Sequence, residues 1–286
     1  MKKISLILLI LLLCGCVNNK TVDLNQINNF NFDNADEFDF DIHSQEYLLL
    51  RVSDLTVLKS KDIDKVIYPA SLTKILTMDT VLHMVENLND KASVTAEQVN
   101  ELIKEDASLA YIHTDHEYTI EDLLYALILP SGADGAVALE NYFVARGMNL
   151  VEEMNKLASS LGCENSNFVN TTGLHDDNHY TTLSDLLKIV IDTLSYEKGR
   201  EILESLRHKT DDGVFLTSSL RILNRSDATI YGGKTGYTPE SGQSVIVLFN
   251  KQNRSYILMV ANAMGSYSLN QYWHYEDAME IINDLY

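Results

Sequence analysis

Strand-like segments stand at both ends of the globular part of this chain, and a long helical region separates them. Residues 46–52 and 55–58 are short runs rich in β-forming residues on either side of Ser53-Asp54, which predicts a hairpin. Residues 244–249 and 256–263 form a second pair of predicted strands near the other end. Because an isolated strand pair is not stable, the two ends must meet in one sheet. We therefore predict an α/β sandwich with the helical region inserted between its halves.

The helical region begins with a predicted core helix after Pro69, where apolar side chains recur with helical spacing from position 75 to position 85. A second helix is expected to open at Thr119, a favourable N-cap residue, and to end near Pro130. Helical patterns continue over residues 135–146, 149–161 and 182–206. An amphipathic segment at 272–285 is expected to close the chain.

The N-terminus resembles an export signal that ends in a bacterial lipobox. Two lysines precede an apolar run that is well short of the ~20 residues a spanning helix needs. We predict a lipoprotein signal peptide at residues 1–15 and a lipid on Cys16, with a plain secretory signal as the alternative. Residues 16–45 are acidic and rich in Asn, and we expect them to tether the globular part to a membrane outside the cytoplasm.

Composition excludes two classes of ligand. The net charge is −19 and no basic stripe occurs, so nucleic acid is not an expected partner. After removal of the signal only Cys16 and Cys163 remain, without metal-ligand spacing. His175 and His179 lie in one loop beside two aspartates, yet no third ligand is evident, so we expect neither a metal nor another cofactor.

Three short segments carry the candidate chemistry. Ser71 and Lys74 have i, i+3 spacing, which places both on one face of a helix and offers a hydroxyl nucleophile with an amine to take its proton. The same spacing recurs at Ser195 and Lys198, which we interpret as exposed residues of an ordinary helix. Ser71 is preferred because two further segments follow it.

The second segment supplies the hydroxyl of Ser131, and the third is Lys234-Thr235-Gly236. Lys234 and Thr235 can hold a terminal carboxylate through charge-assisted hydrogen bonds. Glycines at such a position allow a ligand backbone to lie along the sheet edge as an added strand.

In these segments and their surroundings the chain resembles the D-alanyl-D-alanine carboxypeptidases, the low-molecular-weight penicillin-binding proteins of serine peptidase family S11. The resembling stretches are residues 68–77 (YPASLTKILT), 118–132, 167–181 and 233–242 (GKTGYTPESG). The resemblance implies a β-lactamase/D,D-peptidase-like fold, with an antiparallel sheet flanked by helices and an inserted helical lobe. It assigns residues 46–286 to the penicillin-binding serine D,D-peptidase domain.

The resemblance also implies roles for the site residues. Ser71 would be the acylated nucleophile, Lys74 its general base, and Ser131 a proton relay. Lys234 and Thr235 would bind the substrate's carboxylate next to Gly236, and the backbone amides of Ser71 and Tyr237 would form an oxyanion hole. The expected partners are peptidoglycan stem peptides, β-lactams as covalent inhibitors, and a membrane through the N-terminal lipid; the expected state is a monomer.

One position departs from the family pattern. Ala133 stands where the family usually has Asn, whose amide contacts both the lysine and the substrate. We expect slower turnover or altered specificity. Two alternatives to a carboxypeptidase stay open: a β-lactamase, with Glu164 as the candidate base, and a weakly active or inert peptidoglycan-binding lipoprotein.

Overall fold

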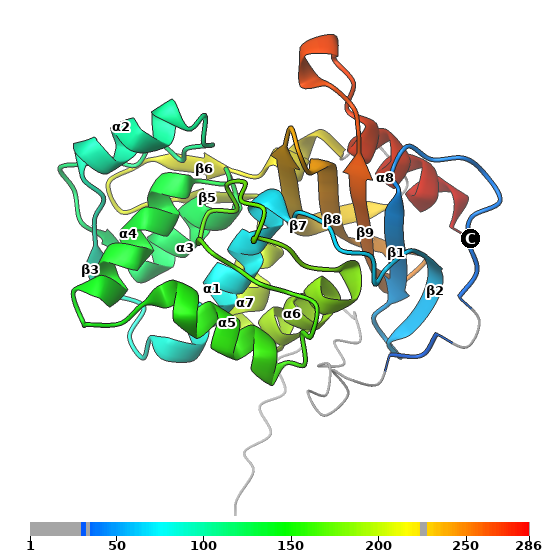
Figure 1. Cartoon of the computed structure of the whole chain (residues 1–286), viewed down its shortest axis with the longest axis horizontal. Coiled ribbons are helices and arrows are strands. Elements are labelled where there is room, and N and C mark those ends of the chain that lie inside the picture. Colours follow the sequence, from blue (N-terminus) through cyan, green and yellow to red (C-terminus); the bar gives the residue numbers. More distant parts are fainter. Residues whose placement is uncertain (1–29, 33–34, 224–227, 286) are drawn as a thin grey trace, which may run out of the picture.

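One five-stranded antiparallel sheet joins the two ends of the chain (Figure 1). The computed structural model describes residues 30–32, 35–223 and 228–285. The sheet has the strand order β2-β1-β9-β8-β7. Its strands are β1 (Glu46–Arg51), β2 (Thr56–Lys61), β7 (Thr229–Thr238), β8 (Gly242–Lys251) and β9 (Arg254–Ala263). The prediction that the two strand pairs share one sheet is confirmed.

The central strands are apolar on both faces, which explains their nearly unbroken hydrophobic runs. Along β9, Ile257 and Met259 face the larger core, whereas Leu258 and Val260 face the smaller one. The larger core lies between the sheet and the helical lobe. The smaller one lies between the sheet and the C-terminal helix α8 (Trp273–Asp284), which covers the opposite face (Figure 1).

The helical lobe is built around α1 (Thr73–Met84), whose residues from Thr73 to Val81 are all buried. A helix buried on every side carries little amphipathic pattern, which is typical of a central core helix. The other helices of the lobe are α2 (Ala96–Lys104), α3 (Ile120–Ile128), α4 (Ala133–Val144), α5 (Leu150–Ser160), α6 (Leu183–Ser195) and α7 (Glu197–Leu203). Two small ribbons, β3 (Lys91–Ala92) with β4 (Tyr118–Thr119) and β5 (Arg207–Lys209) with β6 (Phe215–Thr217), complete it.

The segment predicted as one helix over 182–206 is divided, and the prediction was wrong at this point. Tyr196 has an extended backbone and separates α6 from α7. A Cβ atom on Gly199 would lie 2.3 Å from the Thr193 carbonyl oxygen, so the first turn of α7 packs against the end of α6 more closely than a side chain would allow. The break is therefore set by this close approach and not by local helix propensity.

The turn between β8 and β9 is tighter than the sequence indicated. The strands continue to Lys251 and resume at Arg254, which leaves a loop of Gln252 and Asn253. Both loop residues have positive φ, at 49° and 63°, as a type I′ turn requires. The predicted cap of the second helix is confirmed, because the Thr119 hydroxyl accepts from the Asp122 N–H at 3.0 Å.

Part of the segment assigned to a tether lies against the sheet. Asp36 forms a bridge with Lys59, and the Phe38 ring lies 5.0 Å from Phe40 and 4.9 Å from Tyr47. Residues 35–45 thus belong to the packed domain, which begins earlier than residue 46, the predicted start of the peptidase domain. The signal peptide and Cys16 lie outside the described residues. Among the residues that the structure describes, no helix is long and apolar enough to cross a membrane.

Candidate active site

Ser71 lies in a single 3₁₀ turn, η2 (Ala70–Leu72), that leads directly into α1. Ala70 has φ of +46°, a conformation that is costly for a residue with a side chain and is found mostly at functional sites. The turn places the Ser71 hydroxyl 3.0 Å from Nζ of Lys74, which donates to it. Lys74 Nζ also donates to the carbonyl oxygen of Thr172. The predicted Ser–Lys contact is therefore present.

Lys74 lies in surroundings that favour its neutral form. The side chain is 2% exposed, and burial lowers the pKa of its ammonium group to about 7, partly opposed by the charge of Asp134. An amine with this pKa is partly neutral near pH 7 and can then accept a proton from a hydroxyl group.

A second buried lysine lies at the same site. Nζ of Lys234 donates to the Ser131 hydroxyl at 2.8 Å and to the Thr235 carbonyl at 2.8 Å. Burial, and then the charge of Lys74, hold the Lys234 pKa well below its ordinary value. Ser131 itself has φ of +65°, in the short connection between α3 and α4. The structure thus brings together the hydroxyl and the amine of two segments 103 positions apart.

The third segment lies within β7, the edge strand of the sheet next to the nucleophile turn. A Cβ atom on Gly236 would stand 3.0 Å from the Pro69 carbonyl oxygen and 3.1 Å from Cγ of Leu72. Glycine at this position therefore allows β7 to contact η2, a reason that sequence reasoning had not found. Tyr237 is 39% exposed, and its ring meets that of Tyr267 edge-on at 4.6 Å.

Sequence reasoning missed several groups that position the site. The Thr172 carbonyl accepts from Lys74, and a Cβ on Gly173, where φ is +79°, would lie 1.9 Å from the Ala70 carbonyl oxygen. Thr235 shares a hydrogen bond of 2.9 Å with the Ser219 hydroxyl. The only sequence signal for Thr172 and Gly173 was that they lie in the stretch 167–181, which resembles a family segment. No sequence signal pointed to Ser219.

Ala133 is the first residue of α4 and is 1% exposed. Its methyl group has no atom that can bond to Lys74 or to a ligand. The neighbouring Asp134, in the first turn of α4, holds the preceding loop: its carboxylate accepts from the N–H of Ala110 at 2.8 Å and of Ile112 at 3.2 Å.

The other residues singled out from the sequence have structural partners. Lys198 pairs with Glu121 and Glu201, and the Ser195 hydroxyl donates to its own helix at the Asp192 carbonyl. Ser195 and Lys198 lie on different helices, α6 and α7, and so do not form a one-helix pair.

His179 is buried within the loop that it shares with His175. The Val169 N–H donates to its Nδ1 at 3.2 Å, so the proton lies on Nε2, which bonds to the Thr73 hydroxyl at 2.7 Å. Burial lowers its pKa to about 4. With both ring nitrogens in use, His179 is a neutral structural histidine that supports the start of α1.

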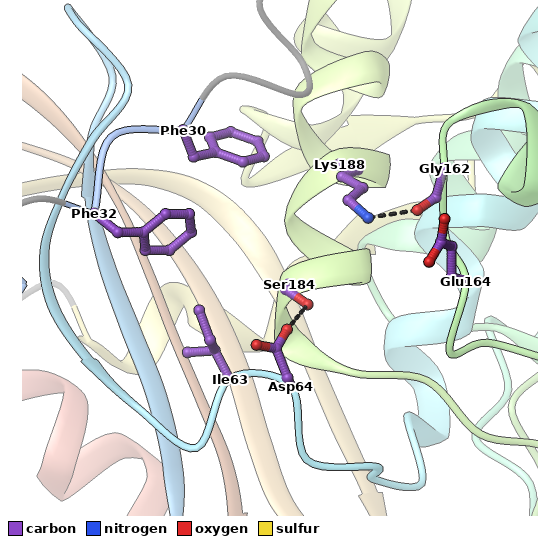
Figure 2. Close-up of a pocket in the computed structure, with 8 residues that line it drawn as sticks. All are labelled: Phe30, Phe32, Ile63, Asp64, Gly162, Glu164, Ser184 and Lys188. Carbon is purple, nitrogen blue, oxygen red and sulfur yellow. Dashed lines mark hydrogen bonds between the residues drawn. The ribbon is translucent and has the colours of Figure 1, made fainter.

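Glu164 lines a separate pocket (Figure 2). The other lining residues are Phe30, Phe32, Ile63, Asp64, Gly162, Ser184 and Lys188. None of these belongs to the Ser–Lys site. Nothing therefore places Glu164 as a base for an acyl group on Ser71.

The fold and the Ser–Lys arrangement define a class, that of the serine D,D-peptidase fold of penicillin-binding proteins. A family model described as D-alanyl-D-alanine carboxypeptidase, peptidase S11, matches residues 32–265. The chain belongs to this family, as the resemblance predicted.

Relatives of known name agree with this placement. The D-alanyl-D-alanine carboxypeptidase DacF of Bacillus subtilis is 28% identical over 72% of this chain and 54% of its own length. A D-alanyl-D-alanine carboxypeptidase of a Streptomyces species is 28% identical over 71% of this chain and 75% of its own. The chain thus spans about half the length of the Bacillus relative.

Solved structures show the same fold. The crystal structure of the Streptomyces K15 DD-transpeptidase superimposes with a TM-score of 0.74 at 25% identity, over 86% of this chain and 98% of that one. Penicillin-binding protein D2 of Listeria monocytogenes, in its cefotaxime-bound form, gives 0.73 at 23% identity with the same coverage. The predicted fold class is confirmed.

Proposed function

We propose that this protein is a serine D,D-carboxypeptidase that removes the terminal D-alanine from peptidoglycan pentapeptides through an acyl-enzyme on Ser71. The observation that carries the proposal is the contact of 3.0 Å between Ser71 Oγ and Nζ of a buried lysine whose pKa is about 7. The family membership reported above supports the same substrate class.

In the first half of the reaction, Ser71 Oγ attacks the carbonyl carbon of the scissile peptide bond and neutral Lys74 takes its proton. The tetrahedral intermediate collapses as the carbon–nitrogen bond breaks. The proton on Lys74 passes through the Ser131 hydroxyl, which also contacts Lys234, to the leaving amine, and Lys74 becomes neutral again. In the second half, Lys74 takes a proton from the water that attacks the ester, and returns it to Ser71 Oγ as the ester bond breaks. Serine needs such a partner because its hydroxyl alone is a weak nucleophile.

Strand β7 supplies the residues that bind the substrate. Lys234 and Thr235 hold the terminal carboxylate, and the carboxylate restores the charged form of Lys234 that burial alone disfavours. The N–H groups of Ser71 and Tyr237 serve as the oxyanion hole, where loss of one donor typically costs ~10²–10³ in rate. β-Lactams would acylate Ser71 and leave slowly.

The test is labelling with a fluorescent penicillin, followed by mass spectrometry of pentapeptide muropeptides incubated with the protein. We expect one label per chain, its loss in Ser71→Ala, and release of D-alanine from pentapeptides. Unlabelled wild type, or equal labelling of Ser71→Ala, contradicts the proposal. Ser195→Ala is the matched control, since its hydroxyl bonds only within a helix, and it should label like wild type.

The two alternatives find less support. The relatives described above carry the names of peptidases, so an inert peptidoglycan-binding lipoprotein is not borne out. A β-lactamase requires a base for deacylation, and Glu164 lines a different pocket. Rapid hydrolysis of a chromogenic cephalosporin would favour the β-lactamase.

We further infer that the protein acts outside the cytoplasm as a monomer and is anchored through a lipid on Cys16. The apolar run before Leu13-Cys14-Gly15-Cys16 supports this location. Metabolic labelling with palmitate should mark the wild type and not Cys16→Ala. Cys163→Ala is the matched control and should label like wild type, because Cys163 is buried. Label retained in Cys16→Ala would exclude this anchor.

A further inference from the structure

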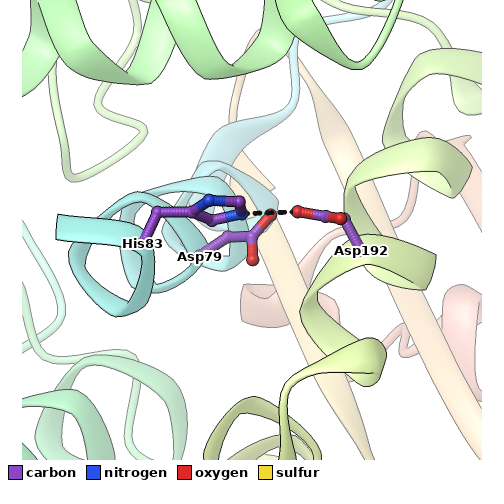
Figure 3. A group of neighbouring side chains, drawn as sticks. All are labelled: Asp79, His83 and Asp192. Atoms are coloured by element: carbon purple, nitrogen blue, oxygen red, sulfur yellow. Dashed lines mark hydrogen bonds and ion pairs between the residues drawn. The ribbon is translucent and has the colours of Figure 1, made fainter. Parts of the chain in front are cut away.

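A second cluster of polar side chains lies farther along the helix that carries the Ser–Lys pair. Asp79 and His83 are four residues apart on α1 and therefore share one of its faces. Asp192 on α6 points toward them (Figure 3). One ligand atom from each of the three side chains lies within 4.8 Å of the other two. His83 Nε2 and Asp192 Oδ2 are 2.7 Å apart.

Asp79 is the feature of this cluster that calls for an explanation. Its side chain is fully buried, and neither carboxylate oxygen makes a hydrogen bond of regular geometry with the described residues, although Asp192 and Thr193 lie close by. A buried carboxylate without partners is costly, and Asp192, itself 5% exposed, adds a second one beside it. Two buried carboxylates beside one histidine are stable together only with a proton or a cation between them.

The only partner of His83 Nε2 among the described residues is Asp192, itself a member of the cluster, so a cation could take the place of that hydrogen bond. The Tyr196 hydroxyl lies 3.1 Å from Nδ1 and can hold the ring in one orientation, as the partners of metal-binding histidines do. Nε2 then faces the two carboxylates. The His83 side chain is 30% exposed, which gives a cation a route from solvent to the buried oxygens.

We propose that Asp79, His83 and Asp192 bind a divalent cation, for which Zn²⁺ is the best match, and that this cation joins α1 to α6. Two carboxylates balance its charge, and one imidazole with carboxylate oxygens is a donor set that zinc accepts, with bonds of about 2.0–2.2 Å. A water molecule would fill the fourth position on the exposed side. The role is structural, since no residue of the proposed peptidase site belongs to the cluster.

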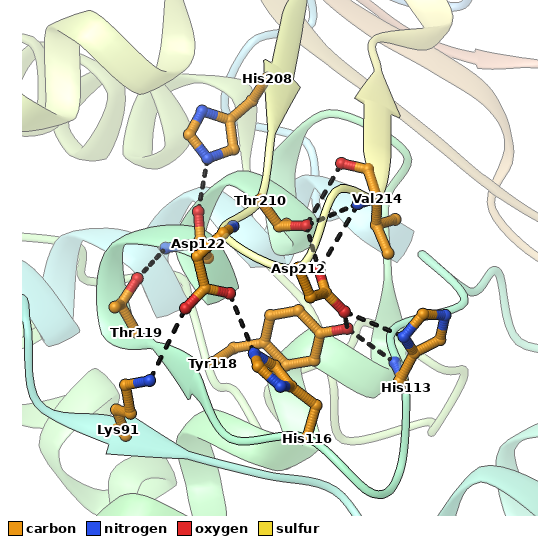
Figure 4. A network of polar contacts seen from close by, with 11 residues as sticks. Lys91, His113, His116, Tyr118, Thr119, Asp122, His208, Thr210, Asp212 and Val214 are labelled. Carbon is orange, nitrogen blue, oxygen red and sulfur yellow. Dashed lines mark hydrogen bonds and ion pairs between the residues drawn. The ribbon is translucent and has the colours of Figure 1, made fainter.

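The other cluster of similar composition in the described part of the chain is already satisfied (Figure 4). His116 pairs with Asp211 at 2.9 Å, and Lys91 lies 3.6 Å from the same carboxylate. Asp212 receives the hydroxyls of Tyr118 and Thr210. These carboxylates have donors without a metal, so this second cluster serves as a control.

The experiment is a zinc titration of the untagged full chain against a chromophoric chelator. We expect one Zn²⁺ per chain, and a rise in Kd of more than about 100-fold in His83→Gln and in Asp192→Asn, the upper end of what loss of a supporting partner costs. His116→Gln is the matched control and should bind zinc like the wild type. Absence of stoichiometric binding, or equal binding by all the variants, overturns the proposal.

Two further measurements separate zinc binding from misfolding. Tyr196→Phe leaves the three ligands in place and should raise Kd about 10-fold, with an unchanged circular dichroism spectrum. Asp79→Asn should remove both zinc binding and the zinc-dependent rise in Tm, while the metal-free variant unfolds no earlier than wild type. If the two aspartates share a proton instead, zinc will leave the wild-type Tm unchanged, and the proposal fails. Penicillin labelling is independent of all these outcomes.

Discussion

Lys74 shows how a single residue acquires its chemistry from contacts that are far apart in sequence. Its spacing from Ser71 could be read directly from the chain, because i, i+3 positions share a helix face. Its second acceptor could not, because a backbone carbonyl such as that of Thr172 is present in every residue type. The depth of burial that lowers its pKa also depends on the whole lobe. The sequence therefore predicted the pair but not the environment that makes the amine a base.

The pH dependence of acylation follows from this environment. The active form of Lys74 is the neutral amine, so the rate should fall about tenfold per pH unit below pH 7 and level off above it. The measurement is the second-order rate constant for penicillin acylation between pH 5 and 9. A rate that does not change between pH 5 and 7 would mean that another group takes the proton. Lys74→Arg should lose acylation at every pH, since guanidinium stays protonated.

Ala133 gives a second test at a single residue. Ala133→Asn places an amide in a site that is 1% exposed, and we expect D-alanine release to stay within about tenfold of wild type, or roughly 1.4 kcal/mol in activation free energy. The reason is that the Ser71–Lys74 contact exists without an amide at this position.

The matched control for this change is Ala133→Leu, whose side chain has the same number of heavy atoms and the same branching as Asn but no polar atoms. Equal effects of both substitutions would show that the polar atoms of the amide do not matter. A gain far above tenfold in the Asn variant only would show that the wild-type enzyme is limited by the missing amide.

Among the secondary-structure elements, those with a strong local pattern were predictable and those set by close backbone approach were not. The strands β8 and β9 are buried on both faces, and their apolar runs made them predictable from the sequence. The break at Tyr196 and the contact of β7 with η2 both depend on a glycine that meets a carbonyl group of another element, Thr193 of α6 in the first case and Pro69 in the second. A glycine in the sequence shows that another backbone could approach closely at that position, but it does not show which backbone does.

Gly236→Ala tests the contact between β7 and the nucleophile turn. The added methyl group would lie 3.0 Å from the Pro69 carbonyl oxygen, so the strand and the turn must separate. We expect a loss of about 1–3 kcal/mol in unfolding free energy, typical of overpacking, and a slower acylation by penicillin. Urea denaturation and stopped-flow labelling measure the two effects.

The control for this variant is Thr229→Ala, at the exposed start of the same strand, which should change both quantities little. An acylation rate equal to wild type in Gly236→Ala would show that the spacing between β7 and η2 does not govern the reaction.

For the molecule as a whole, stability depends on joining its two ends. β1 lies beside β9 in the sheet. The segment 35–45, which precedes β1, contacts α8 on the face of the sheet opposite the helical lobe (Figure 1). The order of predicted elements was enough to require this closure. The element order could not reveal the polar contact between the two ends. In the sequence, Asp277 is one acidic residue among others in an amphipathic helix.

Asp277 of α8 makes the polar contact between the C-terminal helix and the segment that precedes β1. Its side chain is fully buried and accepts from the N–H of His43 at 3.0 Å and of Ser44 at 2.7 Å, and from the Ser44 hydroxyl at 2.5 Å. Asp277→Ala leaves the N–H and the hydroxyl of buried Ser44 without an acceptor, and each unsatisfied group costs about 1–3 kcal/mol. We expect the unfolding free energy to fall by ~2–4 kcal/mol in urea denaturation.

The neighbouring Glu276 supplies the matched control, since its pair with His43 spans 3.9 Å between side chains that are 46% and 59% exposed. Glu276→Ala should therefore change the unfolding free energy by less than about 1 kcal/mol. In both variants the folded fraction should label with penicillin at the wild-type rate, because neither residue belongs to the Ser–Lys site. If Asp277→Ala and Glu276→Ala prove equally stable, the closure is held by apolar packing alone. If Asp277→Ala labels slowly while folded, the N-terminal segment also shapes the site across the sheet.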